Sequence, residues 1–214
     1  MLEIIPSIIA PNFSELKTKL SQLEGLVTWA ELDIMDGVFV PNYTWPFSEV
    51  RQAPEDLKQV DGRLKLSVHL MVENPEQVIE DWLPVADRIM LHYESTSNLE
   101  NIIERYGERA DLGLVLELDT PVSEIGSYLN DVKVIQLMSI KRTGFSGEQF
   151  SDEVFTKIEE LKSLKPDIQI VVDGGVNLDN GKLLVQAGVS GLVVGSGIWQ
   201  ASSVEEAITQ FRGL

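Results

Sequence analysis

The chain has 214 residues, with 34 acidic and 17 basic side chains and a formal net charge of -17. Such an acidic surface repels nucleic acids and anionic membranes, so neither is expected as a partner. The chain contains no cysteine, which excludes disulfides, thiolate catalysis and cysteine-ligated zinc. The first residues do not read as a signal peptide, and no apolar run approaches the ~20 residues of a membrane helix. These features predict a cytoplasmic protein.

An apolar run, a polar turn and an amphipathic segment follow one another eight times along the chain. The apolar runs are nearly continuous in hydrophobicity, which is typical of strands that are buried on both faces of a parallel sheet. The predicted strands are residues 3–9, 30–35, 65–71, 88–93, 112–118, 132–140, 169–172 and 191–194.

The segments between these strands carry the signals of helices. Asn12 and Glu15 have the spacing of a capping box, and Asn177 opens another predicted helix. A proline and an acidic residue at 75–76 predict a third helix start, and residues 203–211 form the last predicted helix. Two prolines interrupt residues 45–60, so that helix is predicted to be short or broken.

Eight strand–helix units in 214 residues predict one (β/α)₈ (TIM) barrel domain spanning residues 1–214. Each unit has about 27 residues, which suits a compact barrel with little decoration. The alternative is an open doubly wound sheet, which typically has a glycine-rich first turn. The first turn of this chain, residues 10–12, contains no glycine.

Ionisable side chains gather where the predicted strands end. Glu31 and Asp33 are two residues apart on one strand and therefore face the same side, while His69 and Asp173 take comparable positions on two other strands. Singly, such a histidine is more often a core residue, and such an aspartate often only caps a turn. Together, four buried ionisable groups are costly unless they are paired or bind a metal. The set suits Mn²⁺, Fe²⁺, Zn²⁺ or Mg²⁺.

Glycines follow the last two predicted strands, at residues 174–175 and 195–197. Backbone amides there can approach a phosphate closely, and phosphate sites recur at this place in (β/α)₈ barrels. The alternative is that these glycines only permit tight turns. Lys141 and Arg142, after the sixth strand, fit either a second phosphate contact or a solvated loop. Met35, Met71 and Met138 fit core positions by their spacing alone.

Several motifs together resemble the ribulose-phosphate 3-epimerases, across nearly the whole chain. The most specific is Asp-Ile-Met-Asp-Gly-Val-Phe-Val-Pro-Asn, residues 33–42, followed in order by Val-His-Leu-Met-Val and Val-Asp-Gly-Gly-Val. The matching segments are residues 6–9, 32–37, 39–42, 68–72, 137–139, 172–176 and 194–196.

The resemblance implies a role for each matching residue. Asp33 and Asp173 resemble the two acid–base carboxylates on opposite faces of the substrate. Together with His69 they also resemble three of the four ligands of one divalent metal ion (Zn, Fe, Mn or Mg). The implied substrate contacts are Ser7, Met35, Met71 and Met138, and the implied phosphate contacts are Gly144, Gly147, Gly174, Gly175, Gly195 and Ser196. A small phosphorylated sugar is the expected partner, and a homo-oligomer is the expected assembly.

The chain departs from the family pattern at three places. Glu31 stands where the family has a histidine ligand; it either binds the metal with an added negative charge or does not ligate. Residues 141–147 stand where the family has an Asn-Pro-Gly-Phe-Gly-Gly run, and they are one residue longer than that run. Trp45 replaces a small apolar residue of the family. We therefore expect a metal-dependent 3-epimerase of a ketose phosphate, with D-ribulose 5-phosphate as the leading candidate substrate. The alternatives are a related phosphosugar isomerase, lyase or decarboxylase, and a phosphosugar-binding barrel without turnover.

Overall fold

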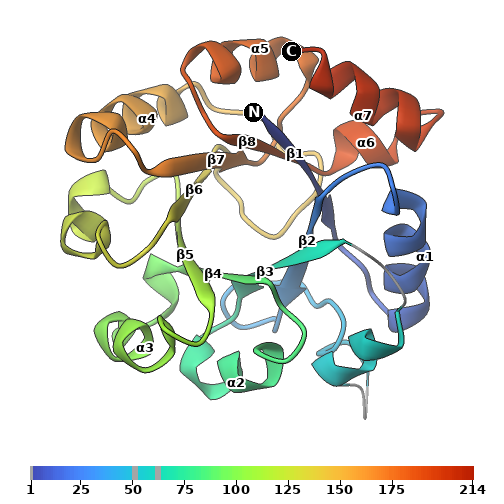
Figure 1. Ribbon diagram of the computed structural model, residues 1–214, viewed down its shortest axis with the longest axis horizontal. Helices are drawn as coiled ribbons and strands as arrows, with labels where there is room; N and C mark the ends of the chain where they lie inside the picture. The colour runs from blue at the N-terminus through green and yellow to red at the C-terminus, as the bar shows by residue number, and fades with distance from the viewer. Residues whose placement is uncertain (1, 50–52, 61–63) are drawn as a thin grey trace.

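The strands close into a parallel barrel in sequence order (Figure 1). The computed structural model describes residues 2–49, 53–60 and 64–214. The last strand pairs with the first from Glu3–Gly191 to Pro6–Val194, so the predicted barrel is confirmed and the open-sheet alternative is wrong. The strands are β1 (Glu3–Ile8), β2 (Trp29–Met35), β3 (Lys65–Met71), β4 (Arg88–His92), β5 (Asp111–Leu116), β6 (Val134–Met138), β7 (Gln169–Asp173) and β8 (Gly191–Val194).

Helices surround the barrel as an outer ring (Figure 1). The α-helices are α1 (Phe13–Leu23), α2 (Ile79–Trp82), α3 (Leu99–Tyr106), α4 (Glu153–Leu164), α5 (Leu178–Gln186), α6 (Ser196–Trp199) and α7 (Val204–Arg212). The 3₁₀ segments are η1 (Pro54–Gln59), η2 (Pro75–Gln77), η3 (Tyr93–Ser95) and η4 (Val122–Tyr128). None of the described helices is both long and apolar enough to cross a membrane.

The predicted helix starts are confirmed where a side chain caps the backbone. The side chain of Asn12 accepts a hydrogen bond from the backbone of Glu15, and Asn177 and Ser203 cap α5 and α7 in the same way. The second unit has only the 3₁₀ segment η1, as its prolines predict, although residues 50–52 and 61–63 lie outside the described part. The third unit begins at the predicted proline, but it is broken, because Val78 (φ -124°) leaves the helical region and separates η2 from α2.

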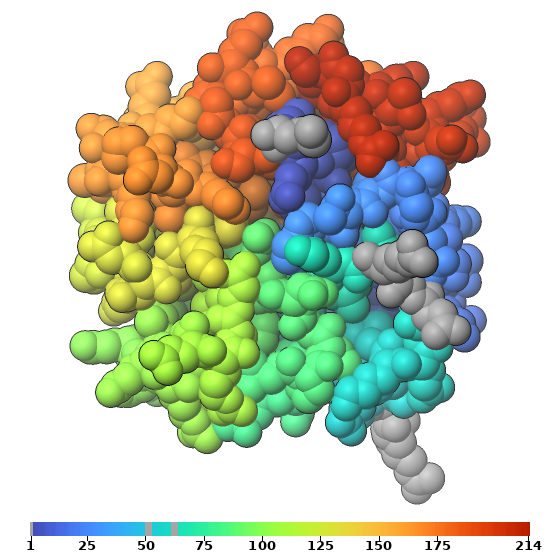
Figure 2. Space-filling view, viewed as in Figure 1, coloured from blue at the N-terminus to red at the C-terminus, as the bar shows by residue number. Residues whose placement is uncertain are grey.

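Alternate residues of each strand face the helices or the barrel interior. Those facing outward join the apolar residues of the helices in one large core. Those facing inward form a second apolar cluster that includes Ile5, Trp29 and Met90. Arg88 lies over the Trp29 ring, with its guanidinium carbon 4.3 Å from the ring centroid. These side chains fill the interior of the barrel. In the space-filling view, atoms cover the middle of the face that is shown (Figure 2). The polar groups therefore gather towards the carboxyl ends of the strands.

Candidate active site

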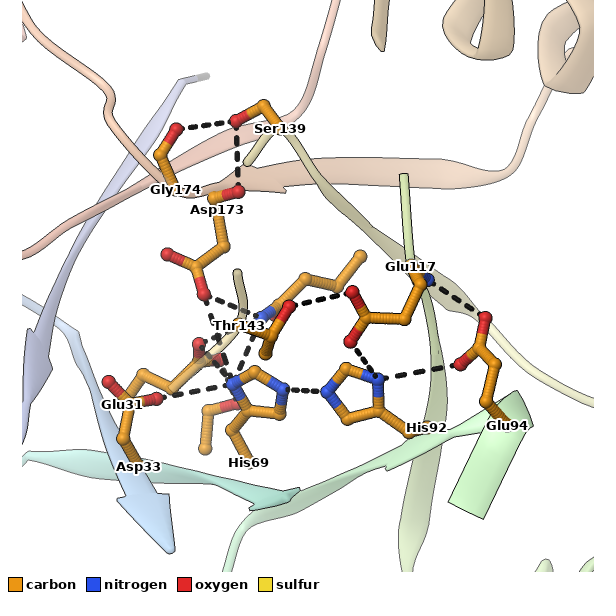
Figure 3. A network of polar contacts seen from close by, with 12 residues as sticks. Glu31, Asp33, His69, His92, Glu94, Glu117, Ser139, Thr143, Asp173 and Gly174 are labelled. Carbon is orange, nitrogen blue, oxygen red and sulfur yellow. Dashed lines mark hydrogen bonds and ion pairs between the residues drawn. The ribbon is translucent and has the colours of Figure 1, made fainter. Parts of the chain in front are cut away.

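The four ionisable residues predicted to share a site lie together inside the barrel (Figure 3). Asp33 is paired in register with His69 across β2 and β3, and Met138 with Asp173 across β6 and β7. One potential ligand atom from each of Glu31, Asp33, His69 and Asp173 lies within 4.8 Å of the others. The period of two along β2 brings both of its acids to this point. The cluster is therefore compact enough to hold one metal ion.

The imidazole of His69 lies among the three carboxylates. Its Nδ1 is 3.1 Å from Asp33 Oδ1, 3.6 Å from Glu31 Oε1 and 3.9 Å from Asp173 Oδ2. The His69 side chain is fully buried, whereas the Asp173 side chain keeps 14% of its surface exposed. The cluster consequently has a buried floor and one acid that reaches towards solvent.

A second histidine orients the first. His69 Nε2 lies 2.8 Å from His92 Nε2, so one of these nitrogens must donate and the other accept (Figure 3). His92 Nδ1 lies near two further acids, 3.3 Å from Glu117 and 3.5 Å from Glu94, without a hydrogen bond to either. A proton on His92 Nδ1 would make His92 Nε2 the acceptor and His69 Nε2 the donor. His69 Nδ1, which lies 3.1 Å from Asp33 Oδ1, would then keep a lone pair for a metal.

Two polar residues that the sequence pattern did not single out hold Glu31. Ser67 donates a hydrogen bond to Glu31 Oε2 over 3.0 Å, and Gln136 Nε2 donates to Glu31 Oε1 over 3.0 Å. All three side chains are buried. Both of these overlooked residues sit within predicted strands at inward positions, and only a polar residue interrupting an apolar run signals them.

Burial raises the pKa of every carboxyl group in the cluster. The pKa of Glu31 rises to about 8, and those of Asp33 and Asp173 rise to about 7. The charge of Asp33 raises the pKa of Asp173 further, whereas a hydrogen bond from Ser7 opposes the rise at Asp33. In the metal-free protein both aspartates therefore retain their protons to a higher pH than an exposed aspartate does.

A cavity of about 270 Å³ opens above the cluster, at the carboxyl ends of the strands. Its size is close to the lower end for small-molecule sites. Glu31 and His69 lie beneath it, while the other predicted site residues line it. These are Ser7, Asp33, Met35, Met71, Met138, Gly144, Gly147, Asp173, Gly174, Gly175, Gly195 and Ser196.

Lys19 of α1 also lines the cavity, a position that was not predicted from the sequence. Among the described lining residues it is the only one with a cationic side chain. Its Nζ donates to the carbonyl of Ile9 over 2.9 Å and lies 2.8 Å from Glu15. It also lies 5.6 Å from the ring centroid of Trp199, in the helix that follows Gly195. The rotation of α1 about its axis decides this position, and the sequence pattern does not report it.

The loop after β6 packs closely against the glycines that follow β7. A side chain at Gly175, where φ is +64°, would place its Cβ 2.8 Å from the carbonyl oxygen of Glu148. Asn42 Nδ2 donates to the carbonyl of Gly144 over 2.9 Å and ties the loop to the segment after β2. Lys141 and Arg142 are exposed outside the cavity lining, and Arg142 stacks on Phe145, which favours the solvated-loop interpretation.

This fold and site define an eight-stranded parallel β/α barrel with a buried carboxylate–imidazole cluster beneath its cavity. The model of the family described as "Ribulose-phosphate 3 epimerase family" matches residues 3–199. The chain belongs to the ribulose-phosphate 3-epimerase family and is an enzyme of that family.

Relatives match over essentially the whole chain. The ribulose-phosphate 3-epimerase of Bacillus subtilis is 34% identical and covers 100% of this chain and 99% of its own. The chloroplastic ribulose-5-phosphate-3-epimerase of Arabidopsis thaliana is 35% identical, over 96% of this chain and 74% of its own. A crystal structure of KGPDC from Streptococcus mutans has a TM-score of 0.75 at 15% identity, covering 99% of this chain and 96% of that one. This last similarity concerns the fold alone.

Proposed function

We propose that this enzyme interconverts D-ribulose 5-phosphate and D-xylulose 5-phosphate. Asp33 and Asp173 exchange the proton at C3 from opposite faces of the sugar. The observation that carries the proposal is the placement of these two acids, which line one cavity and belong to one compact cluster. Epimerisation requires one acid ionised and one protonated at the same time. Burial raises the pKa of both aspartates to about 7 in the metal-free protein, which favours retention of a proton in the pair.

The roles of the two acids alternate with the direction of the reaction. The ionised aspartate removes the C3 proton from one face, and the enediolate that forms receives a proton from the other aspartate on the opposite face. Ser7, which hydrogen-bonds Asp33, keeps that carboxylate directed into the cavity. The side chains of Met35, Met71 and Met138 cover the reacting carbons and exclude water.

The donor set beneath the cavity fits a divalent metal ion. Three buried carboxylates surround one imidazole, so their ionised forms carry an excess of negative charge that a dication would neutralise. Asp33, His69 and Asp173 would hold the ion together with Glu31. When bound, such an ion supplies a Lewis acid that stabilises negative charge on the sugar oxygens.

The other end of the cavity suits the phosphate. Gly174, Gly175, Gly195 and Ser196 line it, and their backbone amides would bind the phosphate. Lys19, which is paired with Glu15, also lines the cavity and would add a cation. This cation matters because the net charge of -17 repels a phosphorylated substrate at long range. Short-range contacts must therefore supply the binding.

A coupled assay on D-ribulose 5-phosphate tests the proposal. The protein is stripped with a chelator and then supplied with Mn²⁺, Mg²⁺, Zn²⁺ and Fe²⁺ in turn, and formation of D-xylulose 5-phosphate is followed. We expect turnover that depends on the metal. Product with fewer carbons would indicate a lyase or decarboxylase instead. Thermal stabilisation by the sugar phosphate without turnover under any metal would indicate a binding barrel.

A further inference from the structure

Gln136 occupies the middle of the carboxylate–imidazole cluster, although its side chain carries no charge. It is fully buried on β6. Its Nε2 lies 3.0 Å from Glu31 Oε1, 3.3 Å from His69 Nδ1 and 3.5 Å from Asp173 Oδ2. The amide nitrogen of Gln136 thus lies close to the potential ligand atoms of three of the four residues that could hold a metal.

The other end of the same carboxamide is unsatisfied. Gln136 Oε1 is buried and has no hydrogen-bond partner among the described residues. Leaving a buried acceptor without a partner costs about 1–3 kcal/mol, so such atoms are rare and call for an explanation. A carboxamide oxygen is also a hard ligand of the kind that Mn²⁺ and Mg²⁺ prefer.

We propose that Gln136 is a fifth protein ligand of the metal, through Oε1. A half-turn of the carboxamide about its last torsion, which is a soft rotation, exchanges the positions of Oε1 and Nε2. The oxygen then faces the cluster, where the amide nitrogen now bridges Glu31 and Asp173. With a metal bound, this rotation gives the buried oxygen a partner, at the cost of the hydrogen bond from Nε2 to Glu31 Oε1. This inference rests on the metal site proposed above.

The charge of the cluster explains why this fifth ligand is an amide. Three carboxylates already exceed the charge of one dication, and a fourth acid would add to an excess that burial makes costly. Gln136 contributes an oxygen without a charge. The resulting set has four oxygens and one imidazole nitrogen, which suits a hard, six-coordinate ion better than tetrahedral Zn²⁺.

The competing role for Gln136 is that it only holds Glu31 in place. Ser67 offers a matched comparison, because it donates to the other oxygen of the same carboxylate over an equal distance of 3.0 Å. Removing a residue that merely supports a metal ligand typically weakens binding by about 10–100-fold. A ligand and a supporting residue should therefore respond differently.

The experiment titrates chelator-stripped protein with Mn²⁺ and reads the free ion by electron paramagnetic resonance, with no substrate present. Wild type is compared with Gln136→Met, Gln136→Glu and Ser67→Ala. We expect Gln136→Met to lose more than about 100-fold in affinity and Ser67→Ala less than that. Gln136→Glu keeps an oxygen ligand and should therefore lose less affinity than Gln136→Met, although its added charge is costly in the metal-free protein. A crystal structure with Mn²⁺ should place Gln136 Oε1 roughly 2.0–2.6 Å from the ion.

Equal losses in Gln136→Met and Ser67→Ala would overturn the inference, as would a crystal structure in which Nε2 still faces the ion. If Gln136→Met does not fold, the Gln136→Glu titration and the wild-type crystal structure decide. Tight Mn²⁺ binding by wild type that Gln136→Met leaves unchanged would refute the fifth ligand but leave the proposed epimerase standing. Absence of metal binding by wild type would overturn the metal site itself.

Discussion

Asp173→Asn isolates one half of the proposed proton exchange. Asparagine has nearly the same size as aspartate and keeps an oxygen that can face a metal, but it cannot take up or deliver the C3 proton. Asp173 lines the cavity and has a pKa of about 7, so its acid–base function is what the substitution removes. General acid–base catalysis is worth about 10²–10⁴-fold. We expect kcat to fall by that factor, or about 3–5 kcal/mol in activation free energy.

The variant should keep the other half of the chemistry. Because Asp33 remains, the C3 proton of one epimer should still exchange with deuterium oxide, without conversion to the second epimer. Asp33→Asn should show the reciprocal pattern, with exchange into the opposite epimer. Proton NMR of each pentulose phosphate measures the loss of the C3 signal, and the coupled assay measures conversion.

Binding of the substrate phosphate should survive in Asp173→Asn, because the glycine backbone that lines the cavity is untouched. Thermal stabilisation by D-ribulose 5-phosphate provides the control. Unchanged turnover in Asp173→Asn would refute the two-carboxylate reasoning. Exchange of the same epimer by both variants would refute the assignment of one aspartate to each face.

Three further predictions address the metal, the phosphate and pH. Glu31→Ala should lower metal occupancy measured by elemental analysis, and full occupancy would show that Glu31 does not ligate. Lys19→Met should raise KM for the sugar phosphate about tenfold, because it removes a charged contact in the cavity. Lys141→Met is the control and should leave KM unchanged, because Lys141 lies outside the cavity lining. Equal effects of the two substitutions would show that Lys19 does not bind the phosphate. The raised pKa values of Glu31, Asp33 and Asp173 favour the protonated acids, so the metal-free protein should lose stability as pH rises from about 4 through about 7–8. Added Mn²⁺ should then raise Tm more at pH 8 than at pH 6, and the opposite order in thermal unfolding would contradict these shifts.

The barrel could be predicted from the sequence because its parallel strands are continuous apolar runs of regular spacing. The same regularity predicted that Glu31, Asp33, His69 and Asp173 meet, since the carboxyl ends of the strands converge on one face of the barrel. The lengths of the covering helices were less predictable. The break at Val78 is a matter of local backbone geometry, and no residue type at that position signals it.

The overlooked residues show where pattern reasoning ends. Gln136 lies inside an apolar run, and its importance appears only when three other strands bring their side chains within reach. Lys19 is one of several charged residues on an amphipathic helix, and the packing of α1 decides that this one faces the cavity. Both depend on the relative placement of elements far apart in the chain.

The most direct test of the proposed chemistry follows the C3 proton of D-ribulose 5-phosphate in deuterium oxide, using wild-type enzyme loaded with Mn²⁺. We predict D-xylulose 5-phosphate that carries deuterium at C3 and retains all of its carbons. Product that keeps its original C3 hydrogen, or no conversion with any of the four metals, would contradict exchange of the C3 proton by Asp33 and Asp173.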